Sequence, residues 1–139
     1  MHIDVKNDGK IIKNRWTPEP RIYHGKESVK LFLRNNKIPL LTVLAKKNAL
    51  QSAGGFTESN EPQYSEDYSL WMRMLAKGFR FLGMSQSLAR YNKHKDQSTK
   101  NKNILHVLRA IRSLEIDDEE ISRLKNESIK FWIYRYLMH

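Results

Sequence analysis

The clearest pattern in the chain is an apolar stripe of helical period between residues 66 and 76. Four large side chains stand three or four positions apart on one face: Tyr68, Trp71, Met72 and Leu75. Ser65, directly before this segment, belongs to the residue types favoured at a helix N-cap, and Lys77 and Gly78 are typical of a helix end. The pattern predicts a central helix with one buried face.

Short strands are predicted before and after this helix. Apolar residues flank Asp8 and Gly9, and Asp-Gly between extended apolar pieces is a strong signal of a β-hairpin. The run 40–45 is apolar apart from one threonine and is bounded by a proline and a lysine pair, which predicts a strand buried on both faces. Residues 79–83 and 87–91 are typical of two strands joined by a turn.

Further helices are predicted near both ends of the chain. Apolar periodicity indicates helices from Gly25 onward and over residues 104–116, and a short helix over 47–53 is stopped by two glycines. Asp117 is expected to cap a last helix. The final stretch, 131–138, is apolar nearly all round, so it needs cover from the protein's own core, from a partner or from a membrane interface.

Composition limits the class of protein. A chain of 139 residues with 40% hydrophobic and 29% charged residues is typical of one globular domain. The absence of cysteine excludes disulfides, thiolate catalysis and cysteine-based zinc sites. No signal-peptide pattern follows Met1, and no apolar stretch approaches the roughly 18 residues of a spanning helix. These features predict a cytoplasmic chain, at most peripheral to the inner face of a membrane.

The chain is strongly basic. It has 25 lysine and arginine residues against 15 acidic residues, a formal net charge of +10, which favours polyanions. One local basic cluster contains Arg90, Lys93, Lys95, Lys100 and Lys102. A scattered excess is also typical of a solvated surface. An alternative function is therefore a basic module that contacts phosphates of nucleic acid or of an anionic membrane. The aromatic residues are not interleaved with the basic cluster, which disfavours nucleic acid.

Two features carry candidate chemistry. Glu66 and Asp67 fall at the start of the central helix, where the helix dipole favours ionised carboxylates; this suits either a simple cap or a proton acceptor. Gly54 and Gly55 permit backbone angles closed to other residues and allow another chain or a ligand to come close, with Phe56 as an apolar anchor. Taken alone, the two glycines are typical of a helix C-cap.

Read together, six segments follow a familiar order: 42–45, 47–53, 54–56, 66–73, 77–79 and 90–94. In this order they resemble the C-terminal, acceptor-side half of a family 2 glycosyltransferase with the GT-A fold. The resemblance implies an α/β fold: an incomplete GT-A-like half domain with a short mixed sheet, packed helices and a C-terminal helical pair. Residues 1–98 would form the acceptor-side half, and residues 99–139 a helical extension.

The resemblance also implies roles for single residues. Asp67 takes the position of the catalytic base that accepts the proton of an acceptor hydroxyl, and Glu66 supports it. The loop beside the acceptor pocket corresponds to Gly54, Gly55 and Phe56, which together with Glu66 and Arg73 are the expected substrate-binding residues. Arg73 stands seven residues after Glu66, about two turns along the same helix face, so it is expected to be a structural ion-pair partner.

The nucleotide-binding half of the family has no counterpart in this sequence. That half carries an acidic motif for Mg²⁺ or Mn²⁺, and Asp4, Asp8 and the Asp117-Asp118 pair do not form one, because metal-bridged diphosphate needs converging oxygen ligands. His94 matches a histidine that some relatives place near the metal. The resemblance thus implies a glycan or other hydroxyl acceptor as partner, no nucleic acid, and no cofactor and no activity for this chain alone.

Overall fold

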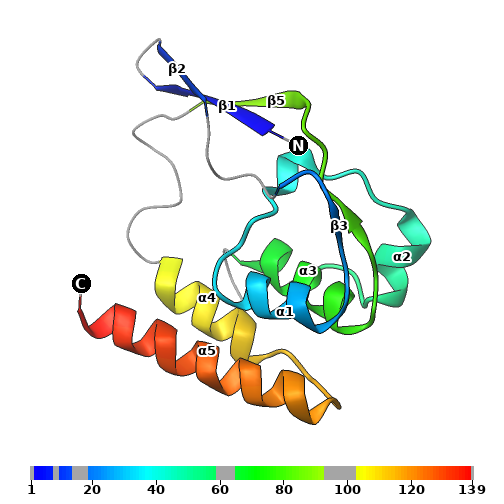
Figure 1. The fold of residues 1–139 in the computed structure, drawn as a ribbon, viewed down its shortest axis with the longest axis vertical. Coiled ribbons are helices and arrows are strands. Elements are labelled where there is room, and N and C mark those ends of the chain that lie inside the picture. Colours follow the sequence, from blue (N-terminus) through cyan, green and yellow to red (C-terminus); the bar gives the residue numbers. More distant parts are fainter. Residues whose placement is uncertain (1, 8–9, 14–18, 59–64, 93–102, 139) are drawn as a thin grey trace.

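The computed structural model describes residues 2–7, 10–13, 19–58, 65–92 and 103–138. Over these residues the chain is a mostly helical small domain with short strands (Figure 1). The helices are α1 (Gly25–Leu33), α2 (Lys47–Ser52), α3 (Glu66–Ala76), α4 (Asn103–Arg112) and α5 (Glu119–Leu137). The strands are β1 (His2–Asn7), β2 (Lys10–Lys13), β3 (Ile22–Tyr23), β4 (Phe81–Leu82) and β5 (Ser87–Asn92). The prediction of an α/β fold is correct only in part, because this arrangement is not a clear Rossmann-like half domain.

The strands form two small sheets. In the first, β1 pairs antiparallel with β2, with Val5 opposite Ile12, and parallel with β5. The predicted hairpin and short mixed sheet are therefore present, and the Asp-Gly turn lies outside the described residues. In the second sheet β3 pairs antiparallel with β4. The two strands predicted over 79–83 and 87–91 thus exist as β4 and β5, but they pair with β3 and β1 and not with each other.

The prediction of a buried strand over residues 40–45 is wrong. Leu40–Thr42 forms a single 3₁₀ turn, in which the Thr42 N–H and hydroxyl both bond the Pro39 carbonyl, at 3.0 and 2.8 Å. Val43 is extended, and Leu44 is 98% exposed. An apolar run becomes a buried strand only when neighbouring strands cover it, and within the described part of the chain no strand pairs with this segment.

Helix α3 lies at the centre of the core, as the apolar stripe predicts. The stripe residues Tyr68, Trp71, Met72 and Leu75 are all at most 2% exposed. Tyr68, Met72 and Leu75 lie in one cluster with apolar side chains of α1, α4 and α5, such as Phe32, Ile111 and Trp132. Trp71 lies in a second cluster with Ala53, Leu70 and Met74. The Tyr68 hydroxyl donates to the Phe32 carbonyl at 2.7 Å, and burial raises the pKa of Tyr68. Burial of this stripe against helices on several sides fixes the orientation of α3.

The helix starts differ from the predicted caps. Ser65 occupies the N-cap position of α3, but its hydroxyl makes no capping bond and donates instead to the His106 carbonyl at 2.8 Å. This bond joins the start of α3 to α4. The cap of α5 is Asp118, one residue later than predicted, and its Oδ1 accepts the Ile121 N–H at 3.0 Å. The tertiary bond of Ser65 thus replaces a local one.

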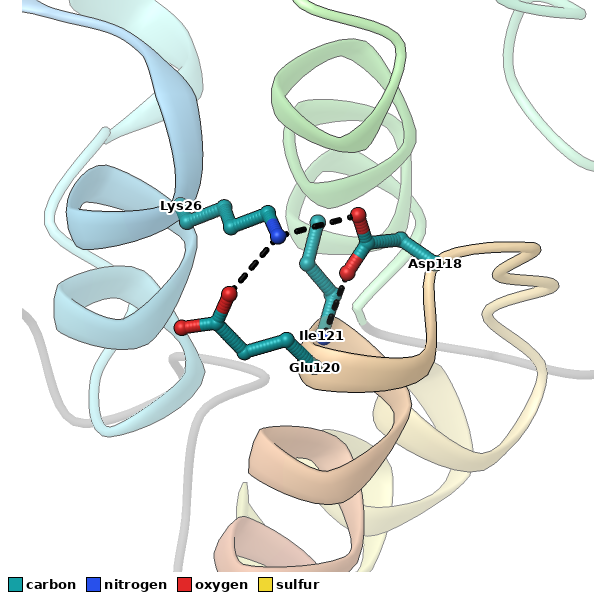
Figure 2. Close-up of polar contacts among 4 residues, drawn as sticks. All are labelled: Lys26, Asp118, Glu120 and Ile121. Carbon is teal, nitrogen blue, oxygen red and sulfur yellow. Dashed lines mark hydrogen bonds and ion pairs between the residues drawn. The ribbon is translucent and has the colours of Figure 1, made fainter.

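A cationic side chain joins the first turns of α1 and α5 (Figure 2). Lys26 Nζ lies 2.6 Å from Glu120 Oε2 and 3.2 Å from Asp118 Oδ2. The hydrogen bond to Glu120 is the main cause that raises the pKa of Lys26. The hydrogen bond from the Ile121 N–H is the main cause that lowers the pKa of Asp118, and the hydrogen bond from Lys26 is the next largest. These groups are exposed, so the cluster orients the two helices and adds little stability.

The lowered pKa of Asp118 predicts a loss of stability in acid. In the folded chain Asp118 holds its proton less tightly than in the unfolded chain, so its contribution is full above the ordinary aspartate pKa and disappears as the pH falls through the lower, folded value. Urea unfolding between pH 7 and pH 2.5 should show a smaller acid-dependent loss for Asp118→Asn than for the parent chain. Asp117→Asn is the matched control, and an equal flattening in that variant would contradict the assignment.

Helix α5 has one buried face and one exposed face at its C-terminal end. Ser128 Oγ and Trp132 Nε1 both donate to the Leu33 carbonyl, at 2.7 and 3.0 Å, so the core covers this side. On the other side Phe131, Tyr134 and Leu137 are 45%, 64% and 74% exposed. The protein's own core therefore covers only part of the aromatic stretch. No helix in the described ranges has the length and apolar character needed to cross a bilayer.

Candidate functional site

Asp67 is a half-buried carboxylate in the first turn of α3. Its Oδ1 accepts the N–H of Tyr68 at 2.6 Å. Burial raises the pKa of Asp67, and the neighbouring charge of Glu66 adds to this effect. Hydrogen bonds from the Tyr68 N–H and the Asn36 side chain act in the opposite direction. The balance is a carboxylate that holds a proton more strongly than a free aspartate does.

No cationic side chain neutralises this carboxylate among the residues that the structure describes. A paired cation would lower the pKa of Asp67 and occupy its oxygens, as in a structural ion pair. Glu66, by contrast, is exposed to solvent. General bases share a raised pKa and partial burial with other carboxylates at helix starts, so these features suit either a proton acceptor or a structural acid.

The glycine pair at the end of α2 closes that helix. The Gly54 N–H donates to the Gln51 carbonyl and the Gly55 N–H to the Leu50 carbonyl, both at 2.9 Å. Both glycines are left-handed, with φ of +88° and +63°. This is the hydrogen-bond pattern of a glycine C-cap, so the local interpretation of the pair is confirmed. A binding role would be additional to this structural one.

Arg73 attaches the loop that follows α2 to α3. We call this loop, Gly54, Gly55 and Phe56, the glycine corner. Its Nη1 donates to the Ala53 carbonyl at 2.9 Å, and its Nη2 donates to the Gly55 carbonyl at 2.7 Å and approaches Thr57 Oγ1 at 3.5 Å. We call Arg73 with the Ala53 and Gly55 carbonyls the arginine latch. A Cβ on Gly54 would lie 2.8 Å from Arg73 Nη1, so the missing side chain at Gly54 makes room for the guanidinium.

The partners of Arg73 differ from the expected one. The two-turn spacing predicts an ion pair with Glu66, and none forms between these two described residues. The guanidinium instead satisfies carbonyls left without partners at the end of α2, where cations are also favoured by the helix dipole. Burial lowers the pKa of Arg73, and its Nε finds no hydrogen-bond partner in the described chain. The contacts that Arg73 makes within the chain are therefore structural ones, to main-chain carbonyls and not to a carboxylate.

Phe56 provides a second attachment between the corner and α3. Its ring meets the Trp71 ring edge-on, with centroids 6.4 Å apart and planes at 74°. Trp71 is buried, and its Nε1 donates to the Ile38 carbonyl at 3.2 Å. Phe56 itself remains 45% exposed. The corner thus has a fixed backbone and one aromatic face open to solvent.

The structure brings some of the expected site residues together. Gly54, Gly55, Phe56 and Arg73 form one contiguous group through the contacts above. Asp67 stands six residues before Arg73 on α3, which corresponds to about 9 Å along the helix axis. One rigid helix therefore carries both the candidate base and the latch. Asn36, which bonds Asp67 from beyond α1, was not expected, because nothing in its local sequence distinguishes it from a helix-terminating asparagine.

His94, together with Lys93, Lys95, Lys100 and Lys102, lies outside the described residues. Among the residues the structure does describe, no group of three histidine or acidic side chains could hold a metal ion. Comparison with protein-family models, with curated proteins and with solved structures yields no significant match.

Proposed function

We propose that this chain is the acceptor-binding, catalytic-base portion of an inverting glycosyltransferase of the family 2, GT-A type. The observation that supports it is Asp67: a half-buried carboxylate in the first turn of a rigid central helix, with its pKa raised by burial and with no cationic partner among the described residues. Carboxylates whose pKa is raised by burial are found more often at functional sites than elsewhere, and structural acids can show the same shift.

The proposed reaction uses Asp67 as the general base. An acceptor hydroxyl approaches the carboxylate, which takes its proton as the hydroxyl oxygen attacks the anomeric carbon of the donor sugar. The bond between that carbon and the diphosphate oxygen breaks, and the nucleoside diphosphate leaves with the bonding electrons. Attack from the side opposite the leaving group inverts the anomeric configuration. Asp67 keeps the proton until solvent removes it.

The glycine corner supplies a surface for the acceptor sugar. No atom lies within 4 Å of the position that a Gly55 Cβ would take, so the main chain is open on that side. The exposed face of Phe56 lies next to it and can stack on the apolar face of a sugar ring. The arginine latch and the Trp71 contact keep both groups in place, which lowers the entropy cost of binding an acceptor.

The donor belongs to a nucleotide-binding half that is not among the described elements. In the full family, Mg²⁺ or Mn²⁺ held there neutralises the diphosphate of the leaving group. In this proposal Glu66 and Asp67 contribute no metal ligand, and the chain by itself binds the acceptor without transferring sugar. Hexosyl transfer requires the two halves together.

Acceptor binding is testable on the chain as it is. Amide signals of an isotopically labelled chain would be followed by NMR during titration with glucose, galactose, N-acetylglucosamine and their short oligomers. We expect saturable shifts at Gly55, Phe56 and Tyr68, because these amides surround the corner and the base. Phe56→Ala should abolish the shifts, and Tyr134→Ala, which removes an exposed aromatic ring of α5, should not. Shifts confined to α5, or none with any of these sugars, would argue against an acceptor site.

A further inference from the structure

An open hollow of about 540 Å³ lies between α1 and β3, apart from the site described above. From α1 and its two cap residues it is lined by side chains spaced along one face, including His24, Glu27, Leu31 and Arg34. The opposite face of α1 carries Val29, Phe32 and Leu33, which are buried against the core. The hollow therefore opens on the side of α1 away from the core, and Asp67 is not among its lining residues. Its volume falls in the range of small-molecule sites.

Positive charge dominates the lining. Arg21 directly before β3, Lys30 of α1 and Arg34 at the C-cap of α1 carry positive charge, against the single carboxylate of Glu27. The Arg21 guanidinium stands over the Tyr23 ring, 4.7 Å from its centroid. Among the described residues, Lys30 and Arg34 make no side-chain hydrogen bond or ion pair. Lys26, one turn before Lys30 on the same helix, is held by two carboxylates.

The hollow also has an apolar part. Ile22 of β3 is 55% exposed beside it, and Leu31 of α1 is half-buried in its wall. Ser28 contributes a nearly buried side chain at the edge of the core. An inorganic ion would use only the cations. A ligand with a charged head and an apolar body would use both surfaces.

We propose that this hollow binds a phosphate monoester, with the phosphate held by Arg21, Lys30 and Arg34 and the organic group resting on Ile22 and Leu31. Guanidinium groups bind phosphate oxygens through paired, charge-assisted hydrogen bonds, which favours phosphate over a carboxylate of lower charge. The single carboxylate of Glu27 lowers the net positive charge of the lining, which disfavours a larger polyanion and suits one dianionic phosphate group. This site is independent of the sugar-transfer proposal.

Calorimetry with n-butyl phosphate, inorganic phosphate and n-butanol at constant ionic strength tests the site. We expect one saturable site for butyl phosphate, binding about tenfold tighter than inorganic phosphate because of the buried methylenes, and no binding of butanol. Arg21→Ala and Arg34→Ala should each weaken butyl phosphate binding about tenfold. Leu31→Ser should reduce the preference for butyl phosphate over inorganic phosphate. Lys47→Ala removes an exposed cation of α2 and should change nothing.

Vesicles containing phosphatidic acid in phosphatidylcholine distinguish the source of the phosphate. If butyl phosphate competes with these vesicles and Arg34→Ala releases them, the ligand is a lipid headgroup; if Arg34→Ala affects only butyl phosphate, it is a soluble monoester. Both outcomes support the site. Non-saturable binding, an equal loss in Lys47→Ala, or unchanged binding of both probes in Arg34→Ala would overturn it. Circular dichroism of each variant excludes unfolding as the cause, since Arg21 and Arg34 are exposed.

Discussion

An Asp67→Asn variant, assayed with a nucleotide-binding half supplied in trans or by fusion, is expected to lose sugar transfer by about a thousandfold. The amide keeps the size of the side chain and an oxygen that can accept the Tyr68 N–H, but it cannot take a proton from an acceptor hydroxyl. Donor and acceptor affinities should change little, so the loss should appear in kcat. Transfer at the parent rate in this variant would remove Asp67 from the reaction.

The same variant should not lose stability at neutral pH. Because the folded pKa of Asp67 is raised, ionised Asp67 opposes folding above that value, and stability from this group increases as the pH falls through the folded pKa toward the unfolded one. Asp67→Asn removes the opposing charge, so its free energy of unfolding at pH 7 should equal or exceed that of the parent chain. Glu66→Gln is the matched control; since Glu66 is exposed, it should leave unfolding nearly unchanged.

Removal of the arginine latch is expected to cost about 3 kcal/mol of stability. Arg73→Ala leaves the Ala53 and Gly55 carbonyls without their donor at the end of α2 and opens a space beside Gly54. Arg73→Lys keeps the charge but lacks the two-pronged donor, so it should recover only part of the loss. Lys77→Ala removes a single exposed bond to the Ser52 carbonyl, 3.0 Å long, and should cost about 0.5 kcal/mol. Urea unfolding of the three variants measures these differences.

A double-mutant cycle separates the latch from the backbone strain at Gly54. Gly54→Ala alone should destabilise the fold for two reasons. The backbone angle φ is +88°, which alanine adopts only with strain, and the new Cβ would lie 2.8 Å from Arg73 Nη1. In the Arg73→Ala background the second cost disappears, so the two substitutions should be non-additive by at least about 0.5 kcal/mol. Additive values would mean that the guanidinium does not approach Gly54 in solution.

The parts of the fold predicted from sequence are those that depend on local period and turn chemistry. The stripe at Tyr68, Trp71, Met72 and Leu75 predicts a buried helix face because the same apolar residues show both the helical period and the side that is buried. The caps were less predictable. The Ser65 hydroxyl bonds a carbonyl 41 residues away, and no local pattern shows that this partner competes with the helix N-terminus.

The candidate site shows the same division. The acidic start of α3 and the glycine corner are visible as residue types in order, but the burial that raises the Asp67 pKa depends on packing. The acceptors of Arg73 are main-chain carbonyls, which every residue has, so the pattern of side chains in the sequence cannot predict these hydrogen bonds. The hollow beside α1 was missed because its cations come from two elements and look like ordinary surface charge in the sequence.

The segment that turns at Leu40–Thr42 has a consequence for the behaviour of the chain in solution. Leu40 and Leu41 are 49% and 50% exposed, and Leu44 is almost fully hydrated. At low ionic strength the formal charge of +10 keeps molecules apart. Salt shortens the range of that repulsion to about 10 Å at 0.1 M, while the attraction between hydrated leucines persists. Self-association should therefore increase with added salt, giving this basic chain a colloidal stability that is greatest in dilute buffer.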